Sequence, residues 1–292
     1  MKTAVVALGG NSLQPPNEKW TYEELVRNIQ ITCKHLISLI RKKYQIVITF
    51  GNAPQIGNLL IQQETGRPEV PAMPLDVCGA MTQGQLGYLI QNCVQNILKK
   101  KSVTVITRVL VDKNDKAFEK PTKPIGPFYK IKTGKSMINE PEGWRRVVPS
   151  PKPKRIIEIE QIKSLIRQGS IVIACGGGGI PVIYDKGLRG IDAVIDKDYS
   201  SELLASQLNA ELLVFLTDVP YVYLNYNSKN PIAIKKMSIK EAKDVMNNFK
   251  EGSMKPKIEA GIRFLRKGKK VIITEPKLLD DALEGKAGTV ME

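Results

Sequence analysis

Short apolar runs alternate with amphipathic stretches along the whole chain. The runs are rich in Val and Ile, which favours buried strands. The predicted strands are residues 3–8, 46–50, 103–111, 171–175, 211–216 and 270–274. Between them the apolar residues recur at helical spacing. The predicted helices are residues 21–43, 56–63, 75–99, 156–166, 200–208, 238–249, 252–268 and a segment from 276 onward. This alternation predicts an α/β fold, a three-layer αβα sandwich around a mainly parallel, doubly wound sheet.

Local signals support two of the helix starts. Thr21 with Glu24, and Ser238 with Glu241, have the S/T-x-x-E form of a capping box. The helix predicted at 75–99 is unusual, because it contains three glycines. We expect these glycines to permit close packing against a neighbouring helix or a second subunit. They are Gly79, Gly84 and Gly87.

Residues 112–153 differ in character from the rest of the chain. Prolines recur through this segment and exclude a regular helix. A connection of this length inside a compact domain is either functional or disordered. Its apolar pieces, 125–129 and 144–148, predict short strands and favour an ordered, protruding lid. We therefore expect one domain over residues 1–292, with 112–153 inserted in it.

Composition places the chain among ordinary globular proteins. It has 292 residues, 42% hydrophobic and 25% charged, which is enough for a substantial core. No run approaches the roughly 20 apolar residues that span a bilayer. The first residues lead into a strand without a signal-peptide pattern. We expect a cytoplasmic protein without a membrane partner.

The formal net charge of +15 fits polyanionic partners such as nucleotides or nucleic acid. However, the Lys and Arg residues are scattered, and aromatic residues make up only 6% of the chain. No platform for stacking bases is therefore evident. We expect small anionic substrates and no nucleic-acid partner.

Cysteine and histidine content excludes several kinds of site. Cys33, Cys78, Cys93 and Cys175 form no C-x-x-C pair, so we expect buried, reduced thiols. His35 is the single histidine, which argues against a histidine-based zinc site and against a Ser-His-Asp triad.

Three predicted strands end in loops that contain glycine, at 9–11, 51–55 and 176–179. Glycine allows positive φ and close backbone approach, so such loops can direct N–H groups at an anion. The carboxyl ends of parallel strands form the ligand-binding edge of an open α/β sheet. Neither a Walker sequence nor G-x-G-x-x-G is present. Glycine loops with isolated lysines and acidic residues still suffice for phosphoryl transfer.

Eight stretches, in order and spread over essentially the full length, resemble the motifs of the amino-acid kinase superfamily and, within it, the carbamate kinases. They are residues 5–11, 51–57, 74–84, 121–127, 143–153, 175–181, 194–198 and 252–257. The Pro-rich insertion resembles the carbamate kinases rather than their relatives. The resemblance implies reversible phosphoryl transfer between ATP and carbamate, giving ADP and carbamoyl phosphate, with Mg²⁺. It also implies a homodimer and use in ATP synthesis during arginine-type catabolism.

The resemblance implies a role for each candidate residue. Lys123, on the insertion, would reach over the site, and Asp196 would organise the lysine ammonium groups. The implied catalytic set is Gly9, Gly10, Asn11, Lys123, Asp196, Lys197 and Lys257. The carbamate end would be held by Gly51, Asn52, Gly176, Gly177 and Gly178. The nucleotide would contact Lys197, Asp198, Thr217, Asp218, Val219, Tyr223, Ser253, Met254 and Lys257. Because Mg²⁺ prefers phosphate oxygens and water, we name no protein ligand for it.

The chain departs from the family pattern at a few positions. Phe50 and Ala53 stand where these kinases usually have His and Gly. Phenylalanine cannot donate a hydrogen bond, and Ala53 is tolerated only at negative φ. Pro220 and Tyr221 replace an Asp-Gly pair, and Lys255 adds a positive charge beside the expected phosphates. We expect activity, with carbamate affinity as the property most affected.

Two other functions remain open. One is a kinase of the same superfamily that acts on a different small acid. The other is a nucleotide-binding protein that has lost turnover, which the altered second loop makes conceivable.

Overall fold

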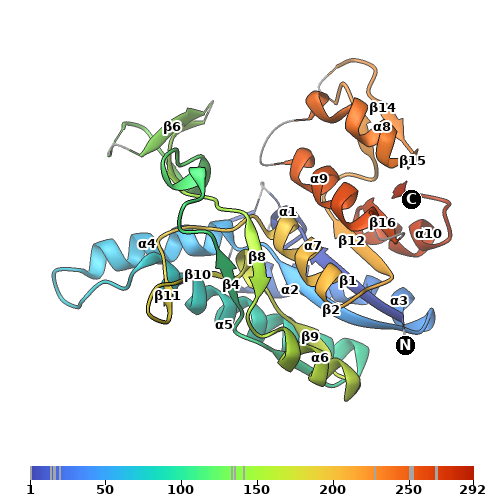
Figure 1. Cartoon of the computed structure of the whole chain (residues 1–292), viewed down its shortest axis with the longest axis horizontal. Helices are drawn as coiled ribbons and strands as arrows, with labels where there is room; N and C mark the ends of the chain where they lie inside the picture. Colours follow the sequence, from blue (N-terminus) through green and yellow to red (C-terminus); the bar gives the residue numbers. More distant parts are fainter. Residues whose placement is uncertain are drawn as a thin grey trace.

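The computed structural model describes residues 2–13, 15, 18–19, 21–132, 134, 136–140, 142–226, 228–249, 253–266 and 269–292. An eight-stranded sheet forms the centre of the fold (Figure 1). In spatial order its strands are β15 (Lys236–Met237), β17 (Thr289–Met291), β16 (Lys270–Thr274), β12 (Leu212–Leu216), β1 (Lys2–Leu8), β2 (Tyr44–Phe50), β9 (Ile171–Ile173) and β3 (Ser102–Thr104). Every neighbouring pair is parallel except β16 with β17. The predicted, mainly parallel sheet is confirmed.

Helices cover both faces of this sheet. In β1, Ala4, Val6 and Leu8 belong to a core shared with one helical layer, whereas Val5 and Ala7 belong to a core shared with the other. The first layer consists of α2 (Tyr22–His35), α3 (Ile37–Arg41), α5 (Leu75–Cys93) and α10 (Leu279–Leu283). The second consists of α6 (Ile159–Arg167), α7 (Lys197–Gln207), α8 (Ile239–Asp244) and α9 (Met254–Leu265). The alternation of side chains along β1 thus produces the predicted three layers.

A smaller sheet contains β11 (Leu188–Gly190), β10 (Ile180–Tyr184), β4 (Arg108–Val111) and β8 (Pro153–Ile156). The single strand predicted at 103–111 is therefore wrong, because β3 and β4 lie in different sheets. The chain changes sheet at Thr107, whose backbone is held by the side chain of Gln83. The Thr107 amide donates to Gln83 Oε1 at 2.7 Å, and Gln83 Nε2 donates to the Thr107 carbonyl at 3.1 Å. The Thr107 carbonyl also accepts from the Ile180 amide at 2.9 Å, so the side chain of Gln83 replaces a backbone partner only at the Thr107 amide.

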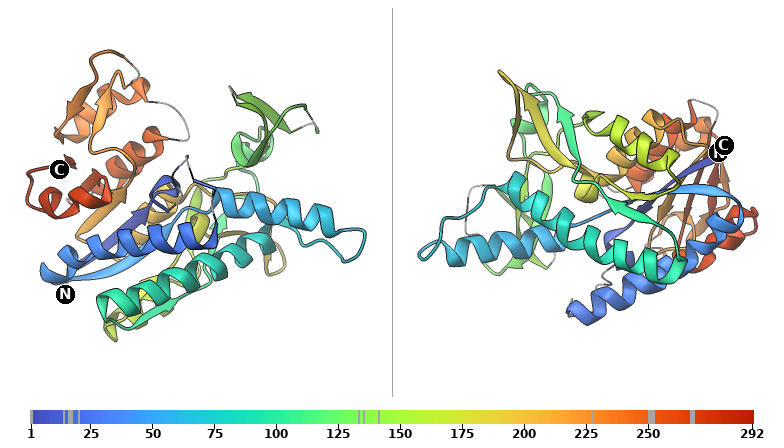
Figure 2. Two further views of the ribbon diagram at one scale, coloured as in Figure 1. Left: turned by 180° about the vertical axis from the view of Figure 1, so that it is seen from behind. Right: turned by 90° about the horizontal axis from the view of Figure 1, so that it is seen from below.

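The insertion contains a three-stranded antiparallel sheet, in the order β5 (Lys123–Tyr129), β7 (Gly143–Val148), β6 (Met137–Glu140). The strands expected at 125–129 and 144–148 are confirmed. This sheet stands on the same side of the molecule as the C-terminal elements, and the two are separate in Figures 1 and 2. It crosses α4 (Ala53–Gly66), where a Cβ on Gly57 would lie only 2.2 Å from Gly126 Cα. So close a crossing requires glycine at both positions, 57 and 126.

Both predicted capping boxes are present, at Thr21 and Ser238. Several boundaries differ from the predictions. The helix predicted at 21–43 is divided into α2 and α3, and that at 75–99 ends in a π-helix, Val94–Leu98. The helix predicted at 238–249 ends at Asp244 and is followed by a 3₁₀ turn, Met246–Asn248. Gly252, at the predicted start of α9, lies outside the described residues. The small strands β13 (Val222–Leu224), β14 (Ile232–Ile234), β15 and β17 were not predicted.

The glycines of α5 behave differently from one another. A Cβ on Gly87 would lie 2.3 Å from Thr104 Cγ2, so this glycine lets the helix approach strand β3. Gly79 and Gly84 have open space where a Cβ would be. Close packing therefore involves a strand, and the remaining glycines leave part of the helix surface uncovered.

All four cysteines are free and buried, as predicted. Within the described ranges, no helix combines the length and the apolar character needed to cross a membrane.

Candidate functional site

The carboxyl ends of β1, β2 and β12 lie side by side and place their loops together. The Gly9 amide donates to the Leu216 carbonyl at 2.8 Å, and the Gly51 amide donates to the Leu8 carbonyl at 3.1 Å. Both amides thus continue the sheet, and the donor role expected of the Gly9 amide is not available to it. Gly10 begins the short helix α1 (Gly10–Leu13), so its amide has no acceptor within that helix. Asn11 lies in α1, but its side chain is outside what the structure describes.

Five charged side chains meet beside these loops. Lys123 Nζ lies 2.6 Å from Asp196 Oδ2. Lys257 Nζ lies 3.1 Å from Asp198 Oδ2, and Lys197 Nζ donates to the other oxygen of the same carboxylate. The insertion, α7 and α9 each contribute one lysine. We call these three lysines and two aspartates the lysine cluster. The convergence expected of these three lysines is therefore present.

The start of α7 organises the acidic part of the lysine cluster. Asp196 is the N-cap residue of α7, and its Oδ1 accepts from the Asp198 amide at 2.9 Å. This bond satisfies one of the amides that a helix N-terminus leaves without partners. Its other oxygen remains directed at Lys123. One carboxylate therefore fixes both the helix end and the lysine of the insertion.

Burial and charge determine the protonation of the cluster. Burial would raise the pKa of Asp198, but the charges of Lys197 and Lys257 outweigh it and lower the pKa to about 2. Burial alone would lower the pKa of Lys257, whereas its contacts with Asp198 raise it. Burial lowers the pKa of Lys197, against the attraction of Asp198. The cluster contains three lysines and two aspartates, so its formal charge is positive and suits an anionic substrate.

Gly51 brings Lys197 next to the first loop. A Cβ on Gly51 would lie 3.3 Å from Lys197 Cδ and 3.4 Å from the Gly10 amide nitrogen. The stem of the lysine thus passes directly beside both glycine loops. A larger residue at 51 would force this stem or the backbone to shift.

The four glycines at 176–179 are buried and fill the space between neighbouring loops. Gly177, Gly178 and Gly179 have positive φ. A Cβ on Gly177 would lie 2.1 Å from Asn52 Nδ2, and one on Gly178 would lie 2.1 Å from the Ile195 carbonyl oxygen. The run therefore lets the loop after β2 approach the segment before α7. Asn52 itself donates to Thr82 Oγ1 at 2.7 Å and is almost fully buried.

Phe50 also contacts this run. A Cβ on Gly176 would lie 2.3 Å from Phe50 Cζ, and the aromatic ring is 1% exposed. The ring thus supports the glycine loop from within the core. Ala53 is not among the residues with positive φ, so its Cβ is accommodated without backbone strain.

Gln83 is a site residue that the sequence reasoning missed. It is 2% exposed, and its Nε2 donates to the Gly176 carbonyl at 3.1 Å as well as to Thr107. The position of this amide among the buried residues of α5 is the signal that identifies it, since a buried polar group needs hydrogen-bond partners. Its role is to fix the glycine run on α5.

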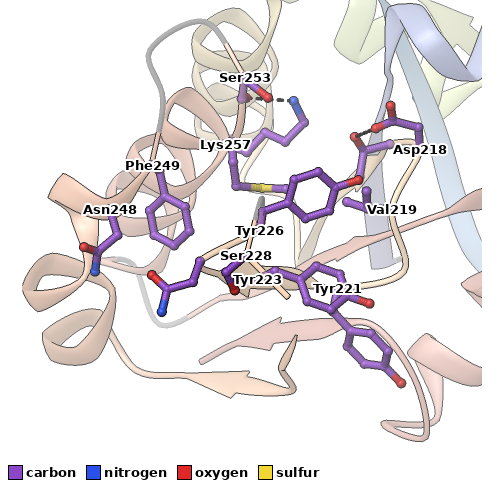
Figure 3. Close-up of a pocket in the computed structure, with 13 residues that line it drawn as sticks. Asp218, Val219, Tyr221, Tyr223, Tyr226, Ser228, Asn248, Phe249, Ser253 and Lys257 are labelled. Atoms are coloured by element: carbon purple, nitrogen blue, oxygen red, sulfur yellow. Dashed lines mark hydrogen bonds between the residues drawn. The ribbon is translucent and has the colours of Figure 1, made fainter. Parts of the chain in front are cut away.

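A pocket of about 490 Å³ lies beside the lysine cluster (Figure 3). Seven of the nine residues predicted to contact the nucleotide line it: Thr217, Asp218, Val219, Tyr223, Ser253, Met254 and Lys257. The other two, Lys197 and Asp198, do not line this pocket and belong to the lysine cluster. Sequence reasoning missed the other six residues of the pocket, which are Tyr221, Asn225, Tyr226, Ser228, Asn248 and Phe249. The volume is within the range of small-molecule sites.

Aromatic rings and one cation give this pocket two chemically different ends. The ring centroids of Tyr221 and Tyr223 are 6.2 Å apart, and those of Tyr223 and Tyr226 are 5.8 Å apart. Lys257 Nζ donates to the Ser253 carbonyl at 3.2 Å and also belongs to the lysine cluster. Figure 3 shows Lys257 and Ser253 at the opposite end from Tyr221. The pocket can therefore hold an aromatic base at one end and phosphate at the other.

The carboxylates Asp196 and Asp198 are both engaged by lysines. Over the residues that are described, no group of three or more His, Cys, Asp and Glu side chains is arranged to hold a metal ion.

Known proteins share this sequence and fold. The model of the amino acid kinase family matches residues 2–275. A carbamate kinase from Pyrococcus horikoshii is 45% identical, over 98% of this chain and 97% of its own length. A carbamate kinase from Staphylococcus haemolyticus is 43% identical, over 100% of this chain and 100% of its own length. The solved structure of carbamate kinase from Giardia lamblia bound to AMP-PNP matches with a TM-score of 0.93 at 38% identity. The match covers 99% of this chain and 98% of the Giardia chain.

Proposed function

This chain belongs to the amino acid kinase family and groups with the carbamate kinases, and on this basis we propose how its site catalyses their reaction. In that reaction ATP and carbamate are interconverted with ADP and carbamoyl phosphate. The observation that carries the proposal is the meeting of Lys123, Lys197 and Lys257 between the glycine loops and the aromatic pocket.

In the direction of ATP synthesis, a terminal oxygen of ADP attacks the phosphorus of carbamoyl phosphate. A new P–O bond forms to ADP, while the P–O bond to carbamate breaks and carbamate leaves with the electron pair. Negative charge is spread over the oxygens of the moving phosphoryl group, so catalysis depends on positioning and on fixed positive charge. Three ammonium groups around one point provide that charge.

Each of these residues has a separate role in the transfer. Lys257 and Lys197 bind the nucleotide phosphates, and Asp198 holds both ammonium groups apart at a fixed spacing. Lys123 neutralises the transferred phosphoryl group and the carbamate oxygens from the side of the insertion. The Gly10 amide, together with Asn11, donates to the phosphoryl group. Residues 217–219, Tyr223 and Met254 bind the nucleoside, and Ser253 lies with Lys257 at the phosphate end.

Carbamate lies next to the loop after β2. Gly51 and Asn52 border the place where it must be, and residues 176–178 support that loop from behind. The buried contacts of Asn52 with Thr82 make it a rigid wall of the site. Residues 112–153 act as a lid over this end.

Mg²⁺ accompanies the nucleotide in this proposal. It would neutralise charge on the phosphate oxygens. Because Asp196 and Asp198 are already paired with lysines, the ion would be held by phosphate oxygens and water, which suits its preference for few protein ligands.

We also infer a homodimer, from one stripe of α5. Val77, Met81, Gly84 and Tyr88 lie on the same side of the helix, because they are spaced by three, four or seven residues. Met81 is 42% and Tyr88 61% exposed, and Gly84 has open space in front of it. A second copy of the chain would cover this apolar stripe. A cytoplasmic location and a part in arginine-type catabolism are proposed from the family resemblance.

The function is tested by supplying purified protein with Mg²⁺, ADP and carbamoyl phosphate and measuring ATP. Production of ATP supports the proposal. If the protein forms ATP from acetyl phosphate or another acyl phosphate in preference to carbamoyl phosphate, a kinase of a different small acid is favoured. Binding of ADP without ATP production would favour a nucleotide-binding protein without turnover.

A further inference from the structure

Tyr199 joins two helices of the site, although it belongs to neither the lysine cluster nor the pocket. It follows Asp198 in α7. Its hydroxyl donates to a carboxylate oxygen of Glu259, on α9. The guanidinium carbon of Arg263, also on α9, lies 4.8 Å from the centre of the tyrosine ring, and Lys152 Nζ lies 5.8 Å from it.

The contacts on α9 are spaced so that they fix the helix. Glu259 and Arg263 are four residues apart and thus lie on one face of α9. Glu259 accepts the hydrogen bond from the Tyr199 hydroxyl and Arg263 lies over the ring, so the tyrosine contacts successive turns of α9. A single side chain thereby restrains both the rotation of α9 and its translation along α7.

The same two helices carry the residues that must be correctly spaced. Lys197 and Asp198 precede Tyr199 in α7, and Lys257 lies two residues before Glu259 in α9. Lys257 meets Asp198 at 3.1 Å. A shift of α9 by a fraction of that distance would separate the ammonium group from its carboxylate and from nucleotide phosphate.

The hydroxyl is a dependable donor. Burial, followed by the hydrogen bond to Glu259, raises the pKa of Tyr199 well above its ordinary value, so the proton is retained at any working pH. Packing alone would be satisfied by Phe or Leu at this position. The polar contact with Glu259 and the cation over the ring are additional to packing.

We propose that Tyr199 is a positioning residue for nucleotide binding, which sets the distance between α7 and α9 and hence the reach of Lys257. The inference rests on the proposed role of Lys257 in binding nucleotide phosphate. It concerns binding rather than turnover. It can therefore be judged by ADP binding even if the protein makes no ATP.

The test compares ADP binding, by calorimetry, in a set of variants of the full chain. Tyr199→Phe keeps the ring and removes the hydroxyl. We expect its Kd for ADP to rise about fivefold, the factor that corresponds to one lost hydrogen bond. Glu259→Ala should give a similar rise. The double variant should be no weaker than either single one, because both remove the same bond.

Two controls separate positioning from general stability. Glu259→Gln keeps an acceptor oxygen and should bind ADP within about twofold of the unchanged protein. Tyr184→Phe removes a hydroxyl from a tyrosine that is 66% exposed and should leave ADP binding unchanged. The proposal is overturned if Tyr199→Phe lowers the melting temperature but leaves the Kd for ADP within twofold. It is also overturned if the effects of the two single variants add.

Discussion

The ammonium group of Lys123 lies 2.6 Å from Asp196 Oδ2, although 73 residues separate them. Lys123 is the first residue of β5 in the insertion, and Asp196 is the N-cap of α7. This ion pair places the start of the insertion over the helix that carries Lys197 and Asp198. The insertion and the start of α7 thus meet through one carboxylate.

The crossing of β5 over α4 should control the position of Lys123. We expect Gly57→Ala to lower kcat at least tenfold, because the new Cβ would require the backbone at Gly126 to move. A displacement of about 1 Å at a reacting group can cost about 100-fold in rate. Steady-state kinetics and ADP calorimetry measure the effect, and ADP affinity should stay within twofold.

Gly66→Ala is the matched control for this prediction. It changes a glycine of the same helix whose Cβ would make only an ordinary contact, 3.6 Å from Val70. Normal turnover in Gly57→Ala would show that the crossing does not position Lys123.

Asp198 should contribute to stability over a defined pH range. It is 4% exposed and paired with two lysines, so Asp198→Asn should lower the free energy of unfolding by about 3–5 kcal/mol near neutral pH. Its pKa falls from the ordinary 3.8 to about 2 on folding. A depressed pKa stabilises the folded state above the ordinary value and ceases to do so as the pH falls through the folded value.

Denaturant unfolding of both proteins between pH 6 and pH 2 tests this. The stability difference between the unchanged chain and Asp198→Asn should be constant down to about pH 4 and then shrink toward pH 2. Asp185→Asn, at an exposed carboxylate, serves as the control. Parallel curves for the unchanged chain and Asp198→Asn over the whole range would contradict the account.

The ring of Phe50 supports Gly176 from the core, so the histidine that the family resemblance implies at this position should affect stability more than substrate affinity. We expect Phe50→His to lower the free energy of unfolding by about 1–3 kcal/mol, the cost of burying a polar group without a suitable partner. The KM for carbamoyl phosphate should change by less than threefold. A tenfold fall in that KM would instead mean that a histidine at position 50 assists substrate binding.

The four cysteines should be unreactive in the folded protein. Burial raises the pKa of Cys33 to about 12, and it also raises the pKa of Cys78, Cys93 and Cys175. Since the thiolate is the reactive form, a chromogenic disulfide at pH 8 should label the native chain slowly, over hours. The unfolded chain should react at four thiols at once. Labelling of the native protein within minutes would disprove this.

The sequence predicted strands β1, β2, β12 and β16 of the central sheet, because these strands are apolar on both faces. The runs at β1, β2, β12 and β16 have no other stable position than the middle of a covered sheet. The split between β3 and β4 was not predictable, since it depends on hydrogen bonds from Gln83, 24 residues away. Local patterns carry no signal for such a contact.

The sequence indicated candidate residues for the site but not their geometry. Motifs identified Lys123, Lys197 and Lys257, but their sharing of two carboxylates follows from the tertiary fold alone. The crossing of Gly57 and Gly126 and the contact between Tyr199 and Glu259 likewise join distant segments. The Gly9 amide shows that an N–H group of a glycine loop need not face a ligand, because it donates to the Leu216 carbonyl of the sheet instead.

The most direct test of the central claim is ATP formation from ADP and carbamoyl phosphate by Lys123→Met. Lys130→Met is the control, because Lys130 is an exposed lysine of the same insertion. If three lysines hold the phosphoryl group, Lys123→Met should fold normally, bind ADP within twofold of the unchanged chain, and lose at least about 100-fold in kcat. Turnover of Lys123→Met equal to that of Lys130→Met would contradict the account.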